Sequence, residues 1–159
     1  MARPSSVYIE TTIVSYLAAR SSRDLRVAAH QEITLDWWTR RRHQFKLYVS
    51  QLVVDEAERG DPVVATRRVG QLAGIPKLAL TRGALVLAQR FVSQSAIPRE
   101  ASEDALHIAI AAVHGVDYLL TWNCRHIANA TIRTRIQELS LDSGYEAPVI
   151  CTPEELLED

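Results

Sequence analysis

Apolar residues along the chain follow two alternating spacings, one typical of strands and one of helices. Short β-branched and aromatic runs predict strands over 7–9, 45–49, 77–80, 116–121 and 149–151. Apolar positions three or four residues apart predict helices over 11–17, 24–42, 51–58, 62–72, 82–94, 101–114 and 130–141. Strands that alternate with helices predict an α/β fold with a parallel, helix-covered sheet. Because no repeat or low-complexity linker interrupts this pattern, we expect a single domain over residues 1–159.

Residues at the ends of these segments support the predicted boundaries. N-cap residues precede four predicted helices: Thr11 or Thr12, Ser50, Asp61 and Thr152. Thr152 is followed by Pro153 and Glu155, the capping-box pattern that opens a helix, and Gly115 ends the helix over 101–114. The adjacent Trp37 and Trp38 cannot both face one core of a regular helix. We therefore expect one of them to be buried and the other to lie at an interface or against a bound base.

Composition narrows the class of protein. Of the 159 residues, 47% are apolar and 23% charged, which are ordinary globular values. The net charge of −1 means that any nucleic-acid site must be a local patch. The two cysteines, Cys124 and Cys151, form no zinc or disulfide pattern. No apolar stretch is long enough to span a bilayer, so we expect a cytoplasmic protein.

Acidic and amide side chains gather where the predicted strands end, which is where open α/β sheets bind their ligands. These residues are Glu10 after the first strand, Asp55 and Glu56 after the second, Glu103 and Asp104 at a helix start, and Asn123 after the strand over 116–121. An oxygen-only set favours Mg²⁺ or Mn²⁺ and phosphodiester chemistry. The glycine-rich nucleotide motifs and the GxSxG elbow of other α/β proteins are absent from the sequence.

Four segments of the sequence resemble the four motifs of PIN domains, and most of all the VapC-type toxins of type II toxin–antitoxin pairs. They are YIETT at 8–12, VDEA at 54–57, EDALHIA at 103–109 and LTWN at 120–123. Their order, spacing and predicted secondary structure agree with the family over nearly the whole chain. The resemblance implies a PIN-like three-layer α/β/α sandwich with a central, mostly parallel sheet.

The resemblance also implies a function, that of a Mg²⁺- or Mn²⁺-dependent endoribonuclease. Carried over by position, the metal ligands are Glu10, Glu56 and Asp104, Asn123 takes the fourth catalytic position, and Thr11 and Thr121 support the site. The implied partners are an RNA substrate, an antitoxin protein and a second copy of the chain. Glu10 and Asn123 stand where PIN domains usually carry Asp. This departure favours a second hypothesis, a catalytically weakened PIN domain that binds RNA or protein.

Several basic side chains are further candidates. Arg125 and His126 follow the strand over 116–121 and could contact RNA phosphates, as could Arg41 in the run of arginines at 40–42. His107 lies one helical turn after Asp104 on the same face of the helix. It could either pack in the core or touch the site, and the sequence leaves both interpretations open.

Overall fold

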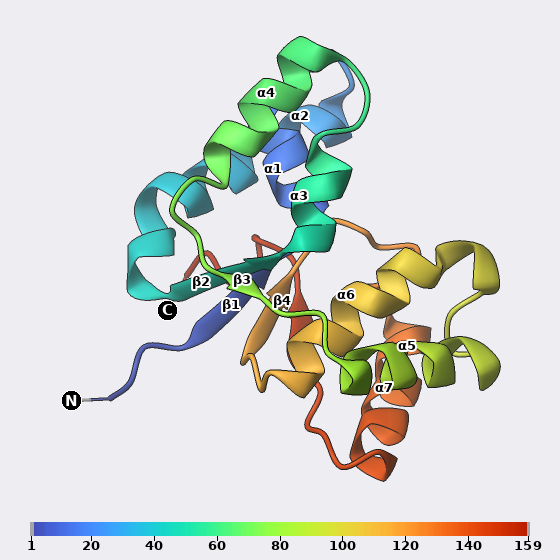
Figure 1. The fold of residues 1–159 in the computed structure, drawn as a ribbon. Helices are drawn as coiled ribbons and strands as arrows, with labels where there is room; N and C mark the ends of the chain where they lie inside the picture. The colour runs from blue at the N-terminus through green and yellow to red at the C-terminus, as the bar shows by residue number, and fades with distance from the viewer. Residues whose placement is uncertain (1, 159) are drawn as a thin grey trace.

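A computed structural model describes residues 2–158 and shows an α/β fold built on one five-stranded sheet (Figure 1). Its strands are β1 (Ser6–Ile9), β2 (Lys46–Ser50), β3 (Lys77–Leu78), β4 (Tyr118–Leu120) and β5 (Val149–Cys151). They lie in the order β3-β2-β1-β4-β5, and every neighbouring pair is parallel. The expected sheet is confirmed, and it is entirely parallel.

Seven α-helices among the described residues cover this sheet as the outer layers of a three-layer α/β/α sandwich. They are α1 (Thr11–Ala18), α2 (Leu25–Asp36), α3 (Gln51–Ala57), α4 (Pro62–Gln71), α5 (Arg82–Ser93), α6 (Ser102–Val113) and α7 (Ala130–Asp142). Figure 1 shows α1–α4 gathered on one side of the sheet and α5–α7 on the other. Within residues 2–158, no helix combines the length and the apolar character needed to cross a bilayer.

The central strand β1 positions the candidate site. All four of its residues are buried, because β2 and β4 flank it and helices cover both faces. Tyr8 pairs in register with Tyr48 of β2 and with Leu119 of β4. The backbone N–H of Glu10 donates to Leu120 O at 3.1 Å and extends this ladder by one residue. The residues that follow β1, β2 and β4 therefore emerge at the same edge of the sheet.

Most predicted helix ends are confirmed, but the first cap is different. Ser50 and Asp61 cap α3 and α4, and Gly115 follows α6 in the left-handed conformation, with φ of +67°. The N-cap of α1 is Glu10 rather than Thr11 or Thr12, and its side chain accepts the backbone N–H of Thr12. The threonine hydroxyls make other contacts, since Thr11 donates to Glu56 and Thr12 donates to Glu10.

The segment predicted as one helix over 24–42 changes its winding near the end. After α2, the chain forms a π-helical turn at Trp37–Arg41 and a 3₁₀ turn at Arg42–Gln44. The expectation that one tryptophan would lie at an interface or against a bound base is wrong, because both are buried, with Trp37 0% and Trp38 7% exposed. The Arg42 guanidinium covers Trp38, lying 4.2 Å from its ring centre.

The predicted capping box at Thr152 forms only in part. The backbone N–H of Thr152 donates to Glu155 Oε1 at 3.1 Å, as the motif requires. The residues that follow make a turn instead of a helix. Leu156 and Leu157 pack against the core there, so tertiary packing decides the path of the chain.

The cap of α4 gives a direct test of the fold. Asp61 Oδ1 accepts the backbone N–H groups of Val63 and Val64 at 2.9 and 3.1 Å. We expect Asp61→Ala to cost about 1 kcal/mol of stability, which lowers Tm by about 2–4 °C in a chain of this size. Asp61→Asn keeps the acceptor and is the control. Thermal unfolding followed by circular dichroism measures both, and an unchanged Tm in the alanine variant would contradict the capping role.

Candidate metal centre

Three side chains from separate parts of the chain meet at the carboxyl edge of the sheet. Glu10 follows β1, Glu56 lies on α3 after β2, and His107 lies on α6. One potential ligand atom from each lies within 4.8 Å of the other two. The structure thus brings together two of the three predicted ligands and adds His107 to them.

Glu10 is a carboxylate enclosed by protein donors. Glu10 is only 3% exposed to solvent. Oε1 accepts the hydroxyls of Thr12 and Thr121, both at 2.5 Å, and Oε2 accepts the Thr12 N–H at 3.1 Å. Burial raises the pKa of Glu10, and the charge of His107 and these hydrogen bonds offset that rise only in part. A further positive charge beside Glu10 would favour its ionised form.

Glu56 has the opposite electrostatic balance. Its Oε1 accepts the Thr11 hydroxyl at 2.5 Å and lies 2.6 Å from His107 Nε2. Burial alone would raise the pKa of Glu56. The hydrogen bond and charge of His107, helped by the hydroxyl of Thr11, outweigh burial and hold the pKa of Glu56 well below its usual range. Glu56 is therefore ionised at neutral pH.

His107 is both a core residue and a neighbour of the carboxylates. It is 0% exposed, and its Nδ1 lies 2.7 Å from the Tyr8 hydroxyl while Nε2 contacts Glu56. Burial lowers the pKa of His107, but Glu56 and the charges of Glu10 and Asp104 outweigh burial and raise it. The question that the sequence left open is resolved, since this histidine packs in the core and touches the site.

Asp104 lies beside this group but not within it. It is on α6, one turn before His107, and its charge acts on that imidazole. Asp104 Oδ2 lies 3.2 Å from His126 Nδ1, so the loop after β4 is fastened to the start of α6. His126 thus contacts Asp104, a predicted metal ligand. The contact of His126 with RNA stays a prediction.

Asn123 and Thr121 organise the loop after β4. Asn123 Oδ1 accepts the His126 N–H at 3.0 Å, and its carbonyl oxygen accepts the N–H groups of Ile127 and Ala128. Thr121 is fully buried, donates to Glu10 and accepts the Asn123 N–H at 2.9 Å. Thr121 thus contacts a carboxylate, as a supporting residue should, whereas Asn123 contributes its amide oxygen to a turn.

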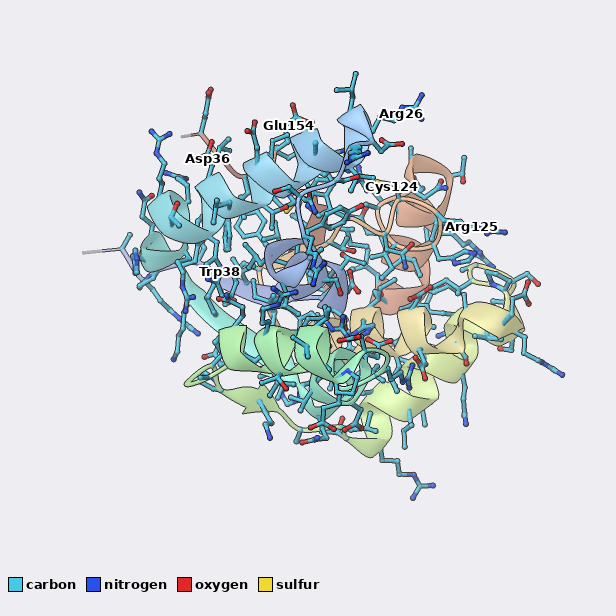
Figure 2. The ribbon with its side chains drawn as sticks, turned by 90° about the horizontal axis from the view of Figure 1, so that it is seen from above. Arg26, Asp36, Trp38, Cys124, Arg125 and Glu154 are labelled. Atoms are coloured by element: carbon cyan, nitrogen blue, oxygen red, sulfur yellow. The ribbon has the colours of Figure 1, made fainter. Side chains whose placement is uncertain are left out.

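The two predicted arginines lie in different surroundings. Arg125 is exposed and extends away from the body of the protein beside Cys124 (Figure 2). Arg41 is half-buried, donates to Gln44 Oε1 at 2.7 Å and lies over the Phe45 ring just before β2. Arg41 is thus at the amino edge of the sheet. The structure places Arg125 near the carboxyl edge and does not bring Arg41 there.

The donor set fits a hard divalent cation. The hydrogen bonds described above occupy both lone pairs of Oε1 in Glu10 and in Glu56. They leave lone pairs on Oε2 of each carboxylate. The neighbouring Asp104 offers a third carboxylate. Carboxylate oxygens alone suit Mg²⁺ or Mn²⁺ better than softer metals.

Comparison with known proteins adds no family to this description. No protein-family model matches the chain, and no curated protein matches it.

The bond from Thr121 to Glu10 predicts a stability effect. Thr121→Val keeps the side-chain shape but removes the hydroxyl that donates to Glu10 and accepts from Asn123. We expect a loss of about 1–3 kcal/mol, because two buried polar groups lose a partner. Urea unfolding in EDTA measures it. Thr66→Val, which removes an exposed hydroxyl on α4, should leave the midpoint nearly unchanged. Equal midpoints for the two variants would show that Thr121 does not stabilise the buried carboxylate.

Proposed function

We propose that the protein is a metal-dependent endoribonuclease, which hydrolyses RNA phosphodiester bonds with Mg²⁺ or Mn²⁺ held by Glu10, Glu56 and Asp104. The observation that carries this proposal is the close approach of Glu10 and Glu56 at the carboxyl edge of a parallel sheet. That edge is where α/β proteins bind their ligands. The resemblance of four sequence segments to the PIN motifs supplies the reaction class.

Charge balance supports a cation at this place. Two carboxylates this close disfavour one another's ionised form, and burial adds to that cost. His107 compensates Glu56, with which it forms the 2.6 Å contact. Glu10 receives only hydroxyl and amide donors, and its pKa remains raised mainly by burial. A dication shared by the carboxylates would favour the ionised form of both.

Different residues have different roles in the proposed reaction. A bound dication supplies an activated water and neutralises charge on the phosphate. Thr11 and Thr121 hold the carboxylates of Glu56 and Glu10 in place. His126 holds Asp104 at the rim. The exposed Arg125 binds an RNA phosphate beside the site, which is the local basic contact that a chain of near-neutral net charge requires.

One observation favours the second hypothesis, a PIN-like module that binds RNA or protein without cleaving RNA. The Asn123 amide oxygen is engaged in the turn after β4, at the fourth position where the family usually carries Asp. The site then relies on three carboxylates. An antitoxin and a second copy of the chain remain the partners that the resemblance implies.

Metal binding is the first test of this proposal. We expect the wild-type protein to bind Mn²⁺ and Asp104→Asn to bind it about tenfold or more weakly, because one anionic ligand becomes neutral. Isothermal titration calorimetry measures both affinities. Glu138→Gln removes an exposed carboxylate on α7 and is the matched control. If Asp104→Asn binds as tightly as this control, Asp104 is not a ligand.

RNA cleavage is the second test. The wild-type protein should cleave tRNA, rRNA or mRNA fragments in Mg²⁺ or Mn²⁺ and stop when EDTA is added. Glu10→Gln should lose nearly all activity, because the metal loses a charged ligand. Glu138→Gln should cleave like the wild type. Binding of these RNAs without cleavage would favour the module, and cleavage that survives both EDTA and Glu10→Gln would overturn the acidic site altogether.

A further inference from the structure

A chain of polar side chains runs through the core behind Glu56. Ser50 Oγ lies 2.7 Å from the Tyr8 hydroxyl, which lies 2.7 Å from His107 Nδ1, and His107 Nε2 lies 2.6 Å from Glu56 Oε1. Ser50, Tyr8 and His107 are 1%, 0% and 0% exposed. Phe and Leu would fill such positions at less cost, because buried polar groups must all find partners.

Hydrogen-bond donors and acceptors can be matched along the whole chain. The Val53 N–H donates to Ser50 Oγ, so the Ser50 proton is free to point at Tyr8. Tyr8 donates to Nδ1 of a neutral His107 or accepts from Nδ1 of a protonated one, and in both states the proton on Nε2 faces Glu56. These contacts, which run from α3 through β1 to α6, set the orientation of the imidazole ring.

His107 is poorly suited to bind a cation itself, although it lies within ligand distance of Glu10 and Glu56. Both of its ring nitrogens are already engaged, one with Tyr8 and one with Glu56. A ligating nitrogen must offer a free lone pair, and Nε2 carries the proton that Glu56 accepts. The second donor to Oε1 is Thr11, so that oxygen of Glu56 is held from two sides.

We propose that Tyr8 and His107 are positioning residues, which hold the Glu56 carboxylate in the orientation that binds the divalent cation. This inference rests on the proposed function. Hydrogen-bonded neighbours of metal ligands commonly have this role. The polar chain carries the constraint from the N-cap of α3 to a carboxylate on the same helix, through two other elements of the fold.

The experiment compares Mn²⁺ affinity by calorimetry in four variants of the full chain. His107→Leu removes both hydrogen bonds and should weaken binding about 10- to 100-fold. His107→Gln restores a side-chain N–H and should recover most of this loss. Tyr8→Phe should weaken binding by a smaller factor and alter the electron paramagnetic resonance spectrum of bound Mn²⁺. Tyr48→Phe, at the register partner of Tyr8 on β2, should match the wild type in both measurements.

The outcomes separate this inference from the proposed function. A wild-type protein that binds no Mn²⁺ overturns both. The positioning role alone is overturned if the wild-type protein binds Mn²⁺ and all three variants bind it equally well. These variants are Tyr8→Phe and His107→Gln, which would also keep the wild-type spectrum, and His107→Leu. If His107→Gln binds as weakly as His107→Leu, the imidazole is a ligand or a packing group instead. Circular dichroism checks that each variant folds. If His107→Leu does not fold, the comparison of Tyr8→Phe and His107→Gln with the control Tyr48→Phe decides the outcome.

Discussion

Two carboxylates held together at a buried edge are the constraint on which this structure depends. Glu10 and Glu56 approach within 4.8 Å, and Glu10 is almost entirely removed from solvent. Such an arrangement persists only if other groups donate hydrogen bonds or positive charge to it. The polar residues of the central core serve this purpose, since threonine hydroxyls surround Glu10 and an imidazole supported by Tyr8 faces Glu56. The need to satisfy these two acids explains why this polar group is kept inside the protein.

The side chain of Glu10 links the site to the fold. Glu10 accepts from the backbone of Thr12 at the start of α1 and from the hydroxyl of Thr121 beyond β4. One side chain thus caps a helix and ties together two elements that flank the sheet edge. Thr12 adds to the connection, since its hydroxyl donates to Glu10 and accepts the Trp122 N–H at 2.8 Å. A residue that the sequence suggests only as a ligand also organises the secondary structure around it.

Local sequence signals predicted most of the elements and the place of the acids. The caps at Ser50 and Asp61 and the glycine after α6 act through neighbouring residues, so the sequence alone reveals them. Contacts between distant residues were harder to predict. The spacing of His107 after Asp104 suggested contact with the site, but its partners Tyr8 and Glu56 come from other elements. The Arg42 guanidinium covers the Trp38 ring. The Asn123 amide oxygen accepts a hydrogen bond within the loop after β4. These arrangements depend on tertiary packing, which periodicity does not encode.

The hydrogen-bonded partners at the site lie far apart in the sequence, and this separation sets the order in which their contacts can form during synthesis. Thr11 meets Glu56 across 45 positions, Tyr8 meets His107 across 99, and Glu10 meets Thr121 across 111. On the ribosome, both acids emerge well before the imidazole and the last hydroxyl that stabilise them. The central strand cannot acquire its second neighbour until β4 has been synthesised, and pairing between such distant segments is slow. The nascent chain therefore carries an incomplete, water-exposed acidic edge until His107, β4 and Thr121 have been synthesised, and folding can close that edge only after that point.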